Sequence, residues 1–77
     1  MGEKGAWLDD DRTQLYHKAT GEIQLFDTPS EAFKWVESQP FPGLTGRPQS
    51  SGGRPQRIEW VDVHGKRRFT AYCRRGL

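Results

Sequence analysis

Residues 22–37, with the sequence EIQLFDTPSEAFKWVE, are the most informative part of the chain, because they predict a strand that runs directly into a capped helix. Ile23 and Leu25 alternate with Glu22 and Gln24, which is the period of a strand. Thr28 is a natural N-cap: its hydroxyl can accept from the N–H of Glu31, whose side chain can reach back to the N–H of Thr28. Pro29 suits the first helical position because the N–H that it lacks would have no partner there. A strand and a helix joined this closely pack together, so we expect the rest of the chain to join their core.

The first of two predicted β-hairpins lies just before this helix. Its strands are residues 15–18 and 22–26, and its three-residue loop ends at Gly21, where a left-handed backbone is needed. In this register Leu15 faces Leu25 and His17 faces Ile23. The predicted core face therefore consists of Leu15, His17, Ile23 and Leu25, and the opposite face consists of Tyr16, Gln24 and Phe26.

The second predicted hairpin has strands at residues 57–63 and 66–73 and turns at His64-Gly65. One face is apolar and predicts the core side, with an Asp62–Arg67 ion pair near the turn. The other face is basic. Its predicted nucleic-acid-binding residues are Arg57, Lys66, Arg68 and Tyr72, extended past the strand by Arg74 and Arg75.

A predicted mobile loop, residues 39–56, separates the helix from the second hairpin and is rich in Pro, Gly and Ser. The prolines at 40 and 42 end the helix near Ser38. The loop repeats Gly-Arg-Pro-Gln at residues 46–49 and 53–56. Gly-Arg-Pro is also the centre of the AT-hook, but the preceding arginine of that motif is absent from both copies, which favours a linker. Arg47 and Arg54 are still candidates for contacts with phosphate or with a narrow minor groove.

The elements together predict a single small α+β domain over residues 1–77. Its antiparallel sheet is made of two hairpins with four to five strands packed on one short helix, in the order β-β-(β)-α-β-β. The uncertain strand is residues 5–8, and residues 1–4 are expected to be frayed. The core is expected to depend on aromatic side chains, because the chain has few apolar residues: Trp7, Trp35, Trp60, Phe26, Phe33 and Phe69.

Residues 5–38 resemble the AP2-like N-terminal DNA-binding domain of phage-type tyrosine integrases. The resemblance is carried by GAW at residues 5–7 and by LYHKATGEIQLFDTPSEAFKW at residues 15–35. Within it, residues 26–35 match the family's Phe-x-Thr-x-x-Glu-Ala-x-x-Trp junction. The resemblance implies three strands before a helix and binding of DNA by a basic sheet. Two features depart from the family's pattern. This half of the chain is acidic rather than basic, and a loop and a second hairpin follow the helix.

Several function classes are disfavoured by the sequence. No apolar run is long enough to span a membrane, and the polar N-terminus is unlike a signal peptide. One cysteine, Cys73, and two distant histidines cannot form a metal site. A single cysteine also cannot form a disulfide within the chain, which fits a reducing compartment. No phosphate-binding loop, paired carboxylates or Cys–His pair is present. We therefore expect a cytoplasmic monomer without cofactor, metal or catalytic activity.

Charge is distributed unevenly along the chain: residues 1–40 have a net charge of −4, and residues 41–77 have +6. Two hypotheses follow. In the first, the chain is a small nucleic-acid-binding module that contacts DNA or RNA through the basic face of the second hairpin. In the second, it is a protein-binding adaptor or inhibitor, because an acidic surface can imitate nucleic acid toward a basic partner. The position of the charges on the fold should distinguish them.

Overall fold

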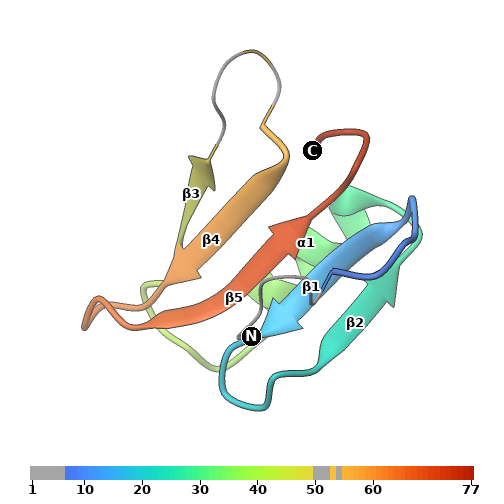
Figure 1. Cartoon of the computed structure of the whole chain (residues 1–77). Helices are drawn as coiled ribbons and strands as arrows, with labels where there is room; N and C mark the ends of the chain where they lie inside the picture. Colours follow the sequence, from blue (N-terminus) through green and yellow to red (C-terminus); the bar gives the residue numbers. More distant parts are fainter. Residues whose placement is uncertain (1–6, 50–52, 54) are drawn as a thin grey trace.

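A computed structural model describes residues 7–49, 53 and 55–77. Within this part of the chain, five strands form one antiparallel sheet in the order β2-β1-β5-β4-β3 (Figure 1). The predicted α+β class with one short helix is confirmed. Two strands precede the helix and three follow it, so the order is β-β-α-β-β-β. The elements in chain order are β1 (Thr13–His17), β2 (Ile23–Phe26), α1 (Pro29–Glu37), β3 (Thr45–Gln49), β4 (Arg57–Val61) and β5 (Arg67–Tyr72).

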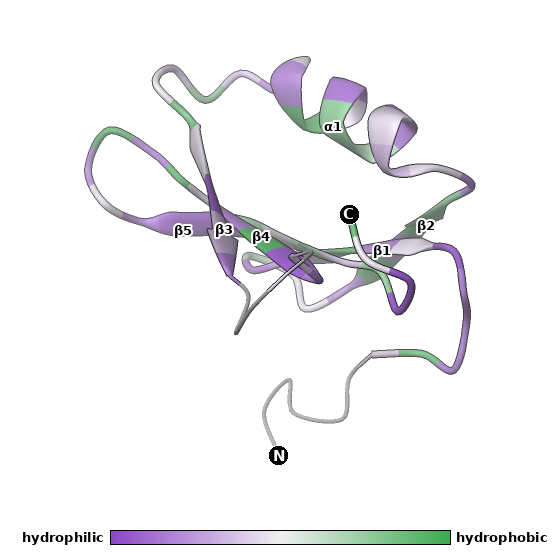
Figure 2. Ribbon diagram, turned by 90° about the horizontal axis from the view of Figure 1, so that it is seen from above, coloured by the Kyte–Doolittle hydropathy of each residue, from purple (hydrophilic) through white to green (hydrophobic). Residues whose placement is uncertain are grey.

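The molecule has two layers, because α1 covers only one face of the sheet (Figure 2). We call this the helix face and the opposite side of the sheet the open face. The core lies between α1 and the helix face, where aromatic rings meet edge to face, among them Phe33 with Trp60 and Trp35 with Phe69. Its buried members are Leu15, Val36, Trp60, Phe69 and Ala71. Of the six aromatic residues expected there, only Trp7 lies elsewhere, on the open face.

The N-cap and the first helical residue are as the sequence predicts, but the return hydrogen bond of the predicted capping box, from the N–H of Thr28 to the Glu31 side chain, is absent among the described residues. Thr28 has an extended backbone, and its Oγ1 accepts a hydrogen bond from the N–H of Glu31 at 3.3 Å. Pro29 is the first helical residue, and Ser38 is the C-cap. The buried side chains Ala32 and Val36 are four residues apart and therefore lie on one stripe of the helix.

The predicted register of the first hairpin is wrong by one residue. Leu15 pairs with Gln24 rather than with Leu25, and Tyr16 pairs with Ile23. The cause is the loop, which has four residues instead of three, because the N–H of His17 donates to the carbonyl of Glu22 at 2.9 Å. A slip of one residue exchanges the two faces of a strand. Gln24 and Phe26 consequently lie on the helix face, and Ile23 and Leu25 lie on the open face, the reverse of the prediction.

The second hairpin has the predicted pairs from Arg57–Tyr72 to Trp60–Phe69, but it differs near its turn. The turn has three residues between Asp62 and Lys66 rather than two, and Gly65 has a φ of +79°. Val61 then pairs with Arg67, and a bulge at Arg68 restores the register. The bulge moves Arg68 away from the open face.

The segment from 39 to 56 was predicted to be a mobile loop, but its residues 45–49 form β3, which pairs with β4. The first Gly-Arg-Pro-Gln copy therefore lies in an edge strand, where a proline is tolerated. Gly46 lies against Trp60: a Cβ there would be 3.1 Å from the indole Nε1.

The sequence also predicted a short strand at residues 5–8. Trp7 and Leu8 do not form a strand, and the other two residues lie outside the described part of the chain. None of the described residues forms a helix long and apolar enough to cross a membrane.

Candidate nucleic-acid interface

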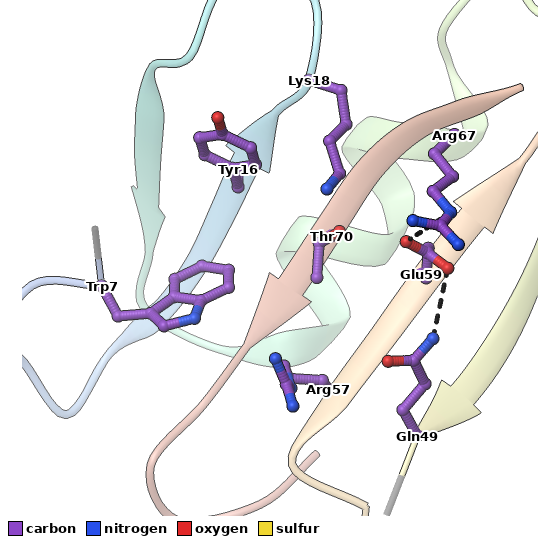
Figure 3. A pocket seen from close by; sticks show the side chains of 8 residues that line it. All are labelled: Trp7, Tyr16, Lys18, Gln49, Arg57, Glu59, Arg67 and Thr70. Carbon is purple, nitrogen blue, oxygen red and sulfur yellow. Dashed lines mark hydrogen bonds and ion pairs between the residues drawn. The ribbon is translucent and has the colours of Figure 1, made fainter. Parts of the chain in front are cut away.

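The open face has a shallow pocket of about 250 Å³ at its centre (Figure 3). Trp7, Tyr16 and Lys18 line one side, and residues of β3, β4 and β5 line the other. Thr70 of the central strand β5 lies between the two sides. The residues on the second side are Gln49, Arg57, Glu59 and Arg67. The pocket thus combines aromatic, cationic and hydrogen-bonding side chains.

Three aromatic side chains gather on the open face. The rings of Trp7 and Tyr72 are stacked, with centroids 4.9 Å apart and planes inclined by 29°. Trp7 also meets Tyr16 edge to face at 6.2 Å. All three side chains are half-buried, so part of each remains exposed to solvent. They can therefore contact a ligand without a rearrangement of the sheet.

Trp7 is held in place by the segment that follows it, which turns back along the open face (Figure 2). The side chain of Gln14 is fully buried and anchors this segment. Its Oε1 accepts from the N–H of Leu8 at 2.7 Å, and its Nε2 donates to the carbonyls of Leu8 and Asp10 at 2.8 and 3.2 Å. A buried amide with several partners fixes the backbone it binds.

The cations of the open face differ in their partners. Lys18, Arg47 and Arg57 form no ion pair with any residue that the structure describes. Lys18 Nζ lies 5.3 Å from the centre of the Tyr16 ring. Arg47 pairs in register with Glu59, which places it on the open face as well. The charges of these three residues are thus available to an anionic ligand.

Glu59 is the acidic residue of the pocket, and two side chains bind it (Figure 3). Arg67 Nε lies 3.3 Å from its Oε2, and Gln49 Nε2 donates to its Oε1 at 3.2 Å. The Glu59 side chain is only 13% exposed, whereas that of Arg67 is 67% exposed. The carboxylate therefore has a defined position at the base of the pocket, and the guanidinium lies at its rim.

Arg68 does not lie with Arg57 and Tyr72 as the sequence predicted. Because of the bulge, its Nε donates to Asp62 Oδ2 at 3.0 Å, and its guanidinium lies 4.6 Å from the ring centre of Phe41. Backbone hydrogen bonds, first from Lys66 and then from His64, and the Arg68 side chain lower the pKa of Asp62. The predicted Asp62–Arg67 pair is thus replaced by Asp62–Arg68, and Arg68 stabilises the hairpin turn.

Arg74 and Arg75 are bound to the acidic N-terminal residues. Arg74 contacts Asp9 at 2.6 Å and Asp11 at 3.8 Å, and Arg75 contacts Asp11 at 3.5 Å. The hydrogen bond to Asp9 raises the pKa of Arg74. These pairs join the two halves of the chain that have opposite net charge.

The other two predicted residues are Lys66, which is exposed beside the hairpin turn, and Arg54, which lies outside the described residues. Sequence reasoning missed Trp7, Lys18 and Arg67 as interface residues. Strand alternation puts Tyr16 on the sheet face opposite to that of Leu15. This pattern could have identified Tyr16 as a candidate interface residue. Among the residues described, no three potential metal ligands lie together.

Comparison of the chain with protein-family models, with curated proteins and with solved structures finds no match. The resemblance to the integrase DNA-binding domains therefore stays a prediction from residues 5–38.

Proposed function

We propose that this protein is a nucleic-acid-binding module that uses the open face of its sheet. The observation that supports this most is that Lys18 and Arg57 line the pocket beside half-buried aromatic rings, with Arg47 on the same sheet face, which the helix leaves uncovered. Cations without an acidic partner can contact phosphates, and aromatic rings can contact bases or sugars. The proposal keeps Arg57 and Tyr72 of the predicted basic face and Arg47 of the predicted loop, and it adds Trp7, Tyr16 and Lys18.

Salt dependence is the physical signature of this mode of binding. Each phosphate contact releases condensed counterions, so the logarithm of the binding constant falls by about 0.7–0.9 per contact for each unit of log salt concentration. Three contacts from Lys18, Arg47 and Arg57 give a slope of about −2 to −3. An interaction governed by apolar burial would show a much weaker dependence.

The test is a fluorescence-anisotropy titration of labelled DNA and RNA oligonucleotides with the whole chain, at several salt concentrations. Lys18→Ala and Arg57→Ala should each weaken binding and reduce the slope by about 0.7–0.9. Lys34→Ala is the matched control, because Lys34 is also exposed but lies on the helix, away from the open face. The proposal fails if no oligonucleotide binds at low salt, or if Lys34→Ala weakens binding as much as Lys18→Ala.

The protein-binding alternative stays a prediction. It depended on an acidic surface, but Asp9, Asp10 and Asp11 are each paired with an arginine. A hydrogen bond from Arg12 to Asp10 lowers the pKa of Asp10 to about 2. These three charges are compensated within the chain, whereas Glu22, Asp27, Glu31 and Glu37 are exposed without an ion pair to a described residue and stay candidates for a basic protein partner.

A further inference from the structure

We infer that the open-face pocket receives one unpaired base of a single-stranded nucleic acid, and that Glu59 favours a guanine there. The inference rests on the proposed function and narrows it to one form of ligand. It depends on the aromatic side of the pocket, on the carboxylate opposite and on the volume between them.

The aromatic side of the pocket argues for a single strand. Trp7 and Tyr16, from the N-terminal segment and β1, line this side of the pocket; the Trp7 ring extends toward β5, and the Tyr16 hydroxyl lies near Gly21 of the β1–β2 loop (Figure 3). Their rings can make their largest contact with the flat face of a base. In a duplex the base faces are stacked on one another and only the edges are accessible in the grooves, so a base must be unpaired to stack on a protein ring.

The pocket is open to solvent and has a volume of about 250 Å³, which gives room for one flat ring system. The cations at 18 and 57 lie on opposite sides of it. They can therefore bind the phosphates on either side of an inserted base.

Among the described residues that line the pocket, Glu59 is the one acidic group, and it would attract a hydrogen-bond donor rather than a phosphate. A carboxylate has about four acceptor positions, and one on each oxygen is used by Arg67 and Gln49. The Glu59 side chain is 13% exposed, and a base edge would have to reach a remaining acceptor position through this exposed part. Guanine offers an N–H and an amino group side by side, whereas the N–H of thymine or uracil is flanked by two carbonyl oxygens that the carboxylate repels.

The experiment uses eight-nucleotide oligo-dT and the same strand with one central base changed to dG, dA or dC, each as a single strand and as a duplex. The expected order for the whole wild-type chain is central dG tightest and dT weakest, with about tenfold between them, and every single strand tighter than its duplex. Tyr16→Leu should weaken all the single strands by about tenfold, because each loses one stacked base.

Glu59→Gln is the variant that separates base selection from a structural role. The amide keeps the shape of the side chain but replaces one acceptor oxygen with a donor. Binding of the dG strand should weaken and binding of oligo-dT should strengthen, so that the preference disappears. A merely structural loss would weaken both strands together.

Each other outcome has a definite meaning. If no strand or duplex binds at low salt, the proposed function and this inference both fail. If duplexes bind as tightly as single strands, the proposed function stands and this inference is wrong. The proposed function also stands, and this inference is also wrong, if the wild-type chain shows no preference for dG or if Glu59→Gln retains that preference.

Discussion

The indole of Trp7 is stacked on the phenol ring of Tyr72, with ring centroids 4.9 Å apart. Trp7 precedes β1 and Tyr72 ends β5, so this contact joins the start of the described chain to the last strand. On the same open face, Gln14 binds the backbone of Leu8 and Asp10. The aromatic side of the candidate site therefore exists only because residues far apart in the sequence meet there.

Trp7→Ala should lower the free energy of unfolding by about 1 kcal/mol, the scale of one aromatic pair. Urea unfolding followed by circular dichroism measures this change. Leu8→Ala is the control, since the Leu8 side chain is 45% exposed and its loss should change stability by less than about 0.5 kcal/mol. Equal effects of the two substitutions would show that the stacking does not stabilise the fold.

Thr28→Ala should destabilise the protein by about 1 kcal/mol, because the N–H of Glu31 loses its acceptor at the helix N-terminus. Thr28→Ser keeps the hydroxyl and should retain most of the stability. Ser30→Ala changes an exposed residue of the same turn and should have little effect. Chemical denaturation of the three variants checks this prediction, which a neutral Thr28→Ala would contradict.

Gly43→Ala should be more destabilising than Gly65→Ala, although both glycines have positive φ, +75° and +79°. The left-handed backbone alone costs a non-glycine residue about 1–2 kcal/mol. At Gly65 a Cβ would meet nothing within 4 Å, whereas at Gly43 it would overlap the side chain of Val63. The overlap should add about 1 kcal/mol or more.

A double-mutant cycle isolates that overlap. Adding Val63→Ala to Gly43→Ala should recover the extra loss, so that the double variant is about as stable as Gly65→Ala with Val63→Ala. Thermal and urea unfolding provide the free energies. If the free-energy changes of Gly43→Ala and Val63→Ala simply add, the alanine methyl group at position 43 does not contact the Val63 side chain.

Asp62→Asn should lower the Tm near neutral pH and make stability less sensitive to acid. The pKa of Asp62 is lower in the folded protein than its ordinary value of 3.8, so the unfolded chain binds the proton more readily. The stabilisation is complete above the ordinary value and is lost as pH falls through the folded one. Between about pH 6 and about pH 3, the Tm of the wild-type chain should therefore drop more than that of Asp62→Asn.

Glu37→Gln is the control for the acid titration. Glu37 is exposed and forms no ion pair with a described residue. This variant should keep the acid sensitivity of the wild-type chain. If Asp62→Asn and the wild type lose stability in parallel, the carboxylate at the hairpin turn does not contribute to it.

The helix and much of the second hairpin could be predicted from the sequence because their determinants are local. Thr28 and Pro29 act within one helical turn, and residues 57–60 and 69–72 alternate clearly between apolar and polar. The register of the first hairpin could not be predicted, because Lys18 can belong either to the strand or to the loop. Strand β3 was missed because its residues are all exposed and its glycine and proline resemble a linker.

The candidate site was predicted only in part. Arg57 and Tyr72 lie on the open face as expected from the strand period. The bulge places Arg68 beside Asp62. Arg74 pairs with Asp9, and Arg75 pairs with Asp11. No spacing in the sequence indicates which carboxylate a given arginine will meet, since both residues must first be brought together by the sheet.

The sequence by itself determined the capped helix, the two hairpins and the α+β class, because caps, turns and strand alternation act over a few neighbouring residues. Only the tertiary structure decided which cations remain available and that Trp7 meets Tyr72. Those outcomes depend on loop lengths, on one bulge and on strand order, and a change of a single residue in a loop exchanges the two faces of a strand.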